Sequence, residues 1–533
     1  MAALSPLVAT DLVRAFGDRL VLDGVTLLAN PAEPVGLVGE NGVGKSTLLR
    51  ILAGVDRPDS GAVIGPTDLV YLGQEPSFAA DATVGTVLRE VLAPLHAAVA
   101  SLETLAASAG QGDPGADEAY ASTLAWAENH DAWDADRRSE LAAARLGVAA
   151  LDRDRPVAEL SGGERTRLAL AAIITRRPDA VVLDEPTNHL DDAAMELVEE
   201  FLASCVGVVV VASHDRVFLD RVARVVVDLD PSWFGVDGEG GDRYTGDLTA
   251  YLRAKRAARR RWEEAFVAQR EALAELVVTA RTTARRTAPG RGPRDGDKMG
   301  YDFKAGTVQR SVARRVRAVE RRIDALESDR VPKPPRPLRL DADLTAGAGR
   351  VTVRGLEVPH RVSLARLDVA PGEHQLVTGA NGSGKSSLLA VLAGTLAPVG
   401  GLVEVTAQRV GCLTQDVVFD EPGRTALEVY ASAVGDREAP SLGDLGLVHP
   451  REVGKPVSQL SVGQQRRLGL AVVIATQPDL LLLDEPTNHI SLALSSELEE
   501  ALAVTPGTLV VTSHDRWLRR RWSGPELRLA SRG

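Results

Sequence analysis

The stretch PVGLVGENGVGKSTLLRILAG, residues 34–54, places a glycine-rich turn between an apolar strand and an apolar helix. Its centre satisfies the pattern GxxxxGK[ST], in which backbone N–H groups surround phosphates and the helix N-terminus favours their negative charge. The same arrangement returns 340 positions later as HQLVTGANGSGKSSLLAVLAG, residues 374–394. The repeat predicts an α/β protein with two nucleotide-binding domains in tandem, each built on a phosphate loop.

The two phosphate loops supply most of the expected nucleotide contacts. Lys45 and Lys385 are predicted to reach the β- and γ-phosphates, and Ser46 and Ser386 are predicted to ligate Mg²⁺. A chance glycine loop is the alternative, but the strand and helix around both copies argue against it. The whole predicted loops are Gly39, Glu40, Asn41, Gly42, Val43, Gly44, Lys45, Ser46 and Thr47 in the first copy, and Gly379, Ala380, Asn381, Gly382, Ser383, Gly384, Lys385, Ser386 and Ser387 in the second.

A second motif, VVLDEPTNHL at Val181–Leu190, returns as LLLDEPTNHI at Leu481–Ile490. Each copy reads as a buried apolar strand that ends in two acids. Asp184 and Asp484 are predicted to hold Mg²⁺, directly or through water. The catalytic acids Glu185 and Glu485 are predicted to polarise the attacking water.

Three shorter motifs also occur twice. His214 and His514 each follow an apolar strand, in ASHDR and TSHDR, and are predicted to contact the γ-phosphate catalytically. A lone histidine there would more often be structural, but both stand 30 positions after the metal-binding Asp. The remaining repeated motifs are the glutamines Gln74 and Gln415, which follow the strands of YLGQEP and CLTQDV, and the segments LSGGERTRLAL at Leu160–Leu170 and LSVGQQRRLGL at Leu460–Leu470.

Together these motifs resemble ATP-binding-cassette domains in both halves of the chain. The resemblance implies two ATP molecules, each held between the phosphate loop of one cassette and the LSGG-type segment of the other. The first site would combine Lys45, Gln74, Asp184, Glu185 and His214 with Ser461 and Gly463. The second would combine Lys385, Gln415, Asp484, Glu485 and His514 with Ser161, Gly162 and Gly163.

Some positions depart from the cassette pattern. Val462 replaces the first glycine of the second LSGG segment, and Ser491 stands where the first copy has Asp191. Phe16 is the candidate for stacking on adenine in the first half, whereas the second half offers only His360. These differences predict unequal turnover at two sites that both bind ATP.

The spacing of the repeats locates an insertion and a linker. Gln74 and Leu160 are 86 positions apart, whereas Gln415 and Leu460 are 45 apart, so the first cassette carries about 41 extra residues. We expect a first cassette at 1–246 with a helical arm at about 83–150, a linker at 247–337 and a second cassette at 338–533.

The linker is basic, with 21 Lys or Arg against 11 Asp or Glu between Tyr251 and Arg330, in a chain of net charge −12. Helical periodicity from Asp247 to about Arg286 and again at Val308, Val312, Val316, Val319, Ile323 and Leu326 predicts an antiparallel hairpin. The connecting loop would be Thr287–Ala305. Without the cassettes, a solvated basic helix would be the simpler interpretation.

Composition narrows the class of protein further. We find neither an apolar run of about 18 residues nor a signal-peptide pattern, and Cys205 and Cys412 stand apart from one another. These features favour a cytosolic protein without metal-binding or disulfide cysteines.

Tandem cassettes, DEPTNH, a helical arm and a charged hairpin resemble the ABC-F family. The resemblance implies a cytoplasmic, ribosome-associated ATPase whose linker reaches tRNA and the rRNA of the large subunit, with no membrane subunit. The long loop, the altered second signature and the Ala- and Arg-rich composition favour a resistance protein against macrolide- or lincosamide-like drugs. Met299, Tyr301 and Phe303 are candidate contacts at the loop tip.

Three alternatives remain open at this point. One is a housekeeping ABC-F translation factor, which shares every motif above. Another is the ATP-hydrolysing subunit of a drug exporter with a separate membrane partner, and the third is a DNA-linked cassette protein.

Overall fold

A computed structural model describes residues 4–17, 19–39, 42–111, 115–188, 190–230, 242–285, 314, 316–334, 349–379, 382–415, 417–437, 439–445, 447–448, 452–487 and 492–530. Two compact units share these residues. One contains both cassettes and Arg243–Tyr251, and the other contains Leu252–Pro335.

The centre of the first cassette is a six-stranded sheet whose strands are parallel except at one edge. Runs of Val, Leu and Ala form its inner strands, and they are buried throughout because helices cover both faces of a parallel sheet. The strand order is β5 (Leu69–Leu72), β6 (Ala180–Asp184), β7 (Val208–Ala212), β3 (Val35–Val38), β8 (Val225–Asp228) and β9 (Arg243–Thr245), with only β9 antiparallel to its neighbour.

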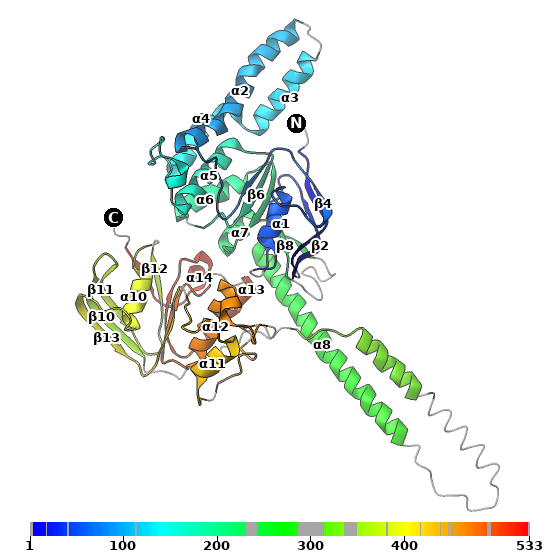
Figure 1. Cartoon of the computed structure of the whole chain (residues 1–533), viewed down its shortest axis with the longest axis vertical. Coiled ribbons are helices and arrows are strands. Elements are labelled where there is room, and N and C mark those ends of the chain that lie inside the picture. The colour runs from blue at the N-terminus through cyan, green and yellow to red at the C-terminus, as the bar shows by residue number, and fades with distance from the viewer. Residues whose placement is uncertain are drawn as a thin grey trace, which may run out of the picture. The chain divides into compact units, whose positions relative to one another are not determined.

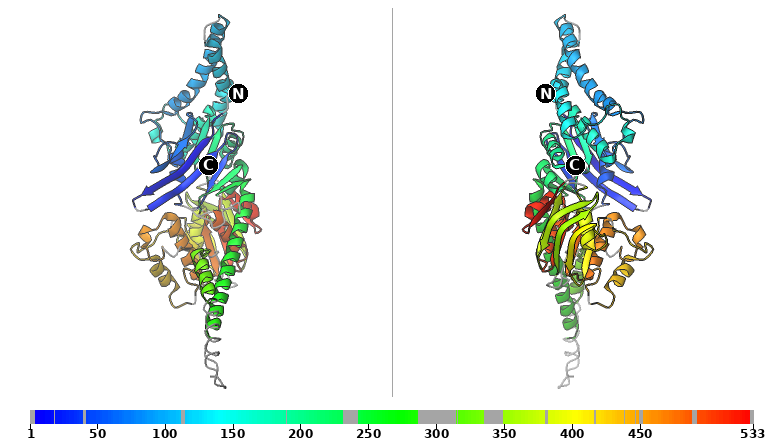
Figure 2. Two further views of the ribbon diagram at one scale, coloured as in Figure 1. Left: turned by 90° about the vertical axis from the view of Figure 1, so that its right-hand side faces the viewer. Right: turned by 90° about the vertical axis from the view of Figure 1, so that its left-hand side faces the viewer.

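A smaller antiparallel sheet covers the phosphate-loop helix α1 (Lys45–Leu52). Its strands are β2 (Arg19–Ala29), β1 (Leu7–Phe16) and β4 (Ser60–Ile64), drawn in blue in Figure 2. One hydrophobic core joins this sheet, α1 and the inner strands of the parallel sheet. The core therefore fixes the direction in which α1 leaves its loop.

The insertion of the first cassette forms helices. α2 (Val84–Gly110) and α3 (Ala116–Asn129) lie side by side as a hairpin, with Leu95, Leu102 and Ala127 in their shared core (Figure 1). The short η1 (Ala132–Asp134) and α4 (Ala135–Arg145) follow. The other helices of this cassette are η2 (Val157–Glu159), α5 (Gly162–Arg176), α6 (Asp192–Ala203) and α7 (Arg216–Val222).

A buried arginine connects the base of this helical insertion to the rest of the cassette. Arg138 of α4 donates hydrogen bonds to the backbone oxygens of His130 (3.0 Å), Asp131 (2.9 Å) and Thr175 (2.7 Å). Thr175 belongs to the last turn of α5. One guanidinium thus holds the end of α3, the start of α4 and the end of α5 together.

Helix α2 qualifies the expectation that no apolar run could span a membrane. Its best window has a mean hydropathy of 1.3, and 11% of that window is buried, so it passes a test of length and composition. It is the one such helix among the described residues. A single helix of this kind is weak evidence for a membrane span, and α3 covers one side of it.

The second cassette repeats both sheets without the arm. The parallel sheet has the order β14 (Val410–Leu413), β15 (Leu480–Asp484), β16 (Thr508–Thr512), β12 (His374–Gly379) and β17 (Glu526–Leu529). The antiparallel sheet has the order β11 (Val362–Val369), β10 (Arg350–Val358) and β13 (Gly400–Thr406), drawn in yellow-green in Figure 2. The helices are α10 (Lys385–Leu392), α11 (Ala426–Val434), η3 (Val457–Gln459), α12 (Val462–Ala475), α13 (Leu492–Ala503) and α14 (Arg516–Arg521).

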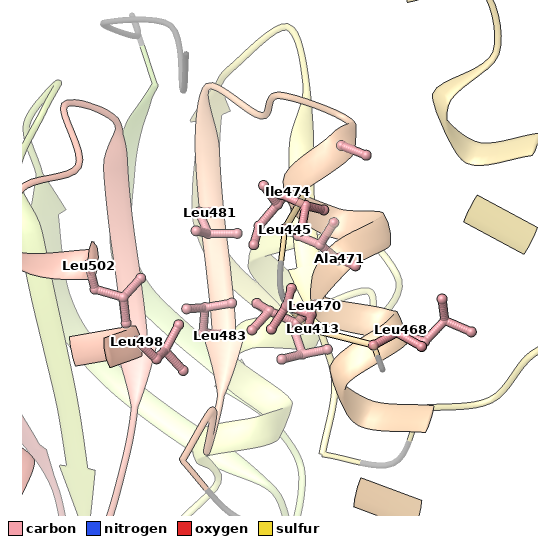
Figure 3. Close-up of a cluster of buried hydrophobic side chains, with 14 of the residues drawn as sticks. Leu413, Leu445, Leu468, Leu470, Ala471, Ile474, Leu481, Leu483, Leu498 and Leu502 are labelled. Atoms are coloured by element: carbon pink, nitrogen blue, oxygen red, sulfur yellow. The ribbon is translucent and has the colours of Figure 1, made fainter. Parts of the chain in front are cut away.

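The core of this cassette is aliphatic. Figure 3 shows Leu481 and Leu483 of β15 between leucines of α13, namely Leu498 and Leu502, and side chains of α12. Because these two strand residues are buried against helices, the strand end that carries Asp484 is held firmly.

The linker unit contains α8 (Leu248–Arg285) from Leu252 onward and a helical stretch at 316–328, the green and yellow-green ribbons of Figure 1. Trp262 Nε1 donates to Pro332 O at 2.8 Å, and Gln269 Nε2 donates to Leu326 O at 3.1 Å, so the two segments run antiparallel. At 1.5 Å per residue α8 is roughly 55 Å long. The predicted loop Thr287–Ala305, with Met299, Tyr301 and Phe303, lies outside the described residues.

The predicted fold class is therefore confirmed. The chain is an α/β protein with two phosphate-loop cassettes in tandem, joined by an antiparallel helical linker.

Candidate ATP sites

Both phosphate loops depend on glycine at the residue before the helix. Gly44 and Gly384 have φ of 115° and 95°, a region that side chains disfavour. A Cβ on Gly44 would lie 2.8 Å from Leu22 Cδ2, and one on Gly384 would lie 2.3 Å from the backbone oxygen of Arg361. Glycine thus lets each loop pack tightly under the antiparallel sheet.

The loop lysines lie where phosphates would bind. Lys45 Nζ donates to Gly39 O at 2.7 Å, and Lys385 Nζ donates to Gly379 O at 2.9 Å, so each ammonium lies within its own loop. The N-cap residues of α1 and α10 are Gly44 and Gly384, which have no side chain to cap the helix, and a helix N-terminus favours an anion.

The other predicted loop residues share this setting. Gly42, Val43, Ser46 and Thr47 surround the start of α1, and Gly382, Ser383, Ser386 and Ser387 surround the start of α10. The predicted contacts Glu40, Asn41, Ala380 and Asn381 lie outside the described residues.

The first predicted metal site brings three predicted residues together. Asp184, at the end of β6, accepts hydrogen bonds from the side chains of Ser46 and Gln74. Burial raises the pKa of Asp184, while these hydrogen bonds and the charge of Lys45 oppose the rise. A hydroxyl, a carboxylate and an amide oxygen are hard ligands that suit Mg²⁺ with phosphate oxygens and water. The described residues contain no cluster of three His, Cys, Asp or Glu side chains that could hold another metal.

The first predicted catalytic acid is largely shielded from solvent, with its side chain 9% exposed. Burial raises the pKa of Glu185 to about 8, although the backbone N–H of His214 and the charge of Lys45 oppose the rise. That N–H donates to Glu185 Oε2 at 3.1 Å, and His214 Nε2 lies 3.4 Å from Oε1. The structure thus brings the predicted base and the predicted γ-phosphate histidine into one pair.

The second catalytic pair is closer. His514 Nδ1 lies 2.9 Å from Glu485 Oε1, and the backbone N–H of His514 donates to Oε2 at 3.1 Å. The hydrogen bond to Glu485 raises the pKa of the His514 imidazole, although burial opposes it. Glu185 and Glu485 share a positive φ of 52° and 49°, which is rare for a residue with a side chain and is associated with functional sites.

A buried arginine that the motif search missed supports the second site. Arg466 donates to the backbone oxygens of Gln415 (2.6 Å) and Glu485 (2.6 Å), and also to that of Asp484. The first cassette has Thr166 at the matching position of its LSGG-type segment. Alignment of the two repeats reveals this difference, but not what Arg466 contacts.

The two LSGG-type segments begin their helices in the same way. Ser161 and Ser461 cap α5 and α12, and each forms a reciprocal capping box with the residue three positions later. Both serines are exposed, Gly162 and Gly163 lie in the first turn of α5, and Gly463 lies in that of α12. These bonds stay within each helix start, so the pairing of each segment with the opposite phosphate loop remains a prediction.

The candidate base-stacking residues differ in their settings. The Phe16 ring is exposed, with the Arg14 guanidinium 4.9 Å from its centroid, and His360 is an exposed residue with a positive φ of 59°. Adenine stacking stays a prediction for both.

Comparison with known proteins agrees with the site. A family model described as ABC transporter matches residues 22–188 and 362–488. The tylosin resistance ATP-binding protein TlrC of Streptomyces fradiae is 40% identical, over 97% of this chain and 96% of that protein. The energy-dependent translational throttle protein EttA of Mycobacterium tuberculosis is 32% identical, over 95% and 88%.

A solved structure shares the tandem fold. The archaeal ribosome recycling factor aABCE1, in complex with the stalk protein aP1, has a TM-score of 0.55 at 18% identity, over 95% of this chain and 85% of that one. At this identity the likeness concerns the fold alone. The repeated motifs, the ATP-site geometry and the full-length relatives together show that the chain is an ATPase of the ABC-F family of tandem ATP-binding-cassette proteins.

Proposed function

We propose that this ATPase binds the ribosome and protects translation from large-subunit antibiotics of the macrolide or lincosamide type, and that ATP hydrolysis releases it. The observation that carries the proposal is the 40% identity, along nearly the whole chain, to a tylosin resistance protein. The protein would act in the cytoplasm without a membrane subunit.

The linker unit supports an RNA partner. Its α8 exposes Arg260, Arg261 and Arg270, and the helical stretch at 316–328 exposes further arginines at Arg317, Arg321 and Arg322. Exposed guanidinium groups along helices can neutralise RNA phosphates without reading sequence. Val316, Val319 and Ile323 are half-buried instead, so the apolar seam and the basic face are separate.

Each part of the chain has a role in this proposal. The cassettes at 1–246 and 338–533 would bind two ATP molecules with Mg²⁺, through Asp184 and Ser46 in one and Asp484 and Ser386 in the other. Glu185 and Glu485 would take the proton of the attacking water, with His214 and His514 beside them. The linker at 247–337 would contact large-subunit rRNA and tRNA.

Sedimentation of a hydrolysis-deficient chain tests ribosome binding. The Glu185→Gln, Glu485→Gln double variant should stay in the ATP state and move with 70S particles in a sucrose gradient. The control adds Lys45→Ala and Lys385→Ala, which remove the phosphate contacts and should return the protein to the top of the gradient. If the Glu→Gln double variant with both lysines intact also stays at the top of the gradient in the presence of ATP, ribosome binding is refuted.

A susceptibility panel in a drug-sensitive host tests protection. We expect growth at raised concentrations of macrolides or lincosamides with the wild-type chain, and none with the Glu→Gln double variant. Ribosome binding without any shift in susceptibility would favour the housekeeping translation factor, for which the 32% identity to EttA is the specific support.

The second candidate is the ATP-hydrolysing subunit of a drug exporter with a separate membrane partner, for which the apolar helix α2 is weak evidence. It predicts that the chain sediments with membranes rather than ribosomes after cell lysis. Loss of that membrane fraction on truncation of residues 92–124 would assign the association to α2 and α3.

A further inference from the structure

A buried group of charged side chains joins the two cassettes directly. Arg216, the first residue of α7, donates to Asp515 Oδ2 at 3.0 Å and to Glu499. Arg516, the first residue of α14, donates to Asp215 Oδ2 at 3.1 Å and to Glu199 Oε1 at 2.6 Å. Matching residues are 300 positions apart, so the contact has internal two-fold symmetry. We call Arg216, Asp215, Glu199, Arg516, Asp515 and Glu499 the crossed network.

Because the crossed network is buried, separation of its charged partners would cost considerable free energy. Arg216 is 1% exposed, and Glu199 and Glu499 are 4% and 7% exposed. Burial lowers the pKa of Arg216, but Asp515 and Glu499 outweigh this effect and the net pKa is raised. Separation of the partners would leave charges in a dry interior, which costs more than loss of a surface pair. The network therefore holds these two helix starts together.

The same residues adjoin the catalytic histidines. Asp215 follows His214, and its Oδ1 accepts the backbone N–H of Phe218 at 2.9 Å, which caps α7. Asp515 follows His514, and its Oδ1 accepts the backbone N–H of Trp517 at 2.7 Å, which caps α14. Each carboxylate thus has one oxygen on its own helix and the other on an arginine of the opposite cassette.

We propose that Arg216 and Arg516 are positioning residues that couple the two ATP sites. Each arginine fixes the Asp next to the histidine of the opposite cassette, so movement of one histidine loop is passed to the other. The path from the first site runs from Glu185 through His214 and Asp215 to Arg516, and the path from the second runs from Glu485 through His514 and Asp515 to Arg216.

Steady-state ATP hydrolysis by the full chain gives the first test. Arg216→Lys and Arg516→Lys keep the positive charge. A lysine ammonium, however, lacks the planar guanidinium with which each arginine binds two carboxylates at once. We expect kcat to fall about tenfold and KM for ATP to stay within about twofold, because no phosphate contact changes. A rise in KM with unchanged kcat would refute a positioning role.

The matched control is Arg145→Lys. Arg145 pairs with Glu200 at 2.8 Å inside the first cassette, one residue along α6 from Glu199. We expect its kcat to stay within about twofold of wild type. An equal loss in this variant would show that any arginine–glutamate pair near α6 has the same effect, which contradicts the proposal.

Hydrogen exchange tests the coupling itself. In a Glu185→Gln, Lys385→Ala background, ATP should occupy the first site alone without turnover. We expect ATP to slow exchange at least about threefold in peptides covering 212–218 and also in those covering 512–518. Arg516→Lys, which lies on the path from the first site, should keep the first effect and abolish the second.

Asp215→Asn provides a second variant that should fold. Asparagine caps a helix as well as aspartate does, so α7 should persist while the bond to Arg516 weakens. The cross-site protection should again disappear. The proposal is overturned if protection at 512–518 never appears in the background chain, or if it survives both substitutions.

Discussion

The two predicted catalytic pairs, Glu185 with His214 and Glu485 with His514, share their motif residues but differ in their surroundings. In the first, burial raises the pKa of Glu185 to about 8 and His214 Nε2 stands 3.4 Å away. In the second, His514 Nδ1 lies 2.9 Å from Glu485 Oε1, and the hydrogen bond to Glu485 raises the pKa of the His514 imidazole. The surroundings of Glu185, rather than the motif that it shares with Glu485, therefore set its pKa before nucleotide binds.

Flanking residues account for part of the difference. Thr512 Oγ1 donates to Asp484 Oδ1 at 2.5 Å, whereas the first cassette has Ala212 at that position. Arg466 holds the backbone of Gln415 and Glu485, whereas the first cassette has Thr166. The second site is thus more extensively supported by its own cassette.

The largest expected effect is on the two predicted water-polarising acids. Glu485→Gln should lower kcat by about 100-fold at pH 7, because it removes the predicted general base of the second site. Glu185→Gln should cost about tenfold or less at the same pH, because most of that acid is already protonated. Single-variant ATPase rates at pH 7 measure the contrast. Equal decreases in kcat for the two variants would mean that the raised pKa of Glu185 does not make the first site less dependent on its acid.

Replacement of Arg466 should have the next largest effect. Arg466→Thr, which installs the residue of the first cassette, should lower kcat about tenfold because three backbone oxygens lose a charged donor. The control is Arg437→Thr, which replaces an exposed arginine of the same cassette whose side chain donates to the Ala433 oxygen at 3.1 Å. If both variants keep wild-type kcat, Arg466 has no part in turnover.

The pKa of Glu185 predicts a pH-dependent stability difference. Between its ordinary value of 4.5 and about 8, the folded chain keeps a proton on Glu185 that the unfolded chain has released. The stability contributed by this raised pKa is present below 4.5 and is lost as the pH rises through 8. Glu185→Gln lacks the titration, so it should melt a few degrees above wild type at pH 8.5 and approach it at pH 5.

Nucleotide-free unfolding at pH 5, 6.5 and 8.5 checks this expectation. Glu485→Gln serves as the comparison at the sister site, where the imidazole of His514 faces the acid. A Glu185→Gln difference that is the same at all three pH values would rule out a titration of Glu185 in this range.

The smallest expected effect concerns Thr512. Thr512→Ala, which installs the first-cassette residue, should lower kcat about twofold because Asp484 loses one hydrogen bond. Thr512→Ser keeps the hydroxyl and should restore the rate. A serine variant as slow as the alanine variant would show that the methyl group matters rather than the hydrogen bond.

The sequence was most informative where local pattern fixes local structure. Continuous apolar strands, glycine loops and paired acids predicted Lys45, Ser46 and Asp184 as site residues, and the structure brings Asp184 to Ser46 and Gln74. Apolar residues on α2 and α3 likewise pack against one another.

Tertiary contacts were beyond sequence reasoning. The repeats show that Arg466 and Thr166 differ, but the backbone oxygens that Arg466 reaches come from segments 51 and 19 positions away. Arg216 and Glu499 are 283 positions apart. The pKa of Glu185 depends on burial, which no local motif encodes.

Arg138 has a mechanical consequence for the arm. Helix α5 begins at the capping serine Ser161 and, in its last turn, carries the Thr175 oxygen that Arg138 binds. A helix transmits displacement along its axis, and about 20 Å of α5 separates these two points. A displacement of the arm would therefore move α5 as a rigid rod. A partner that binds the arm would also restrict the movement of Ser161 at the other end of that helix.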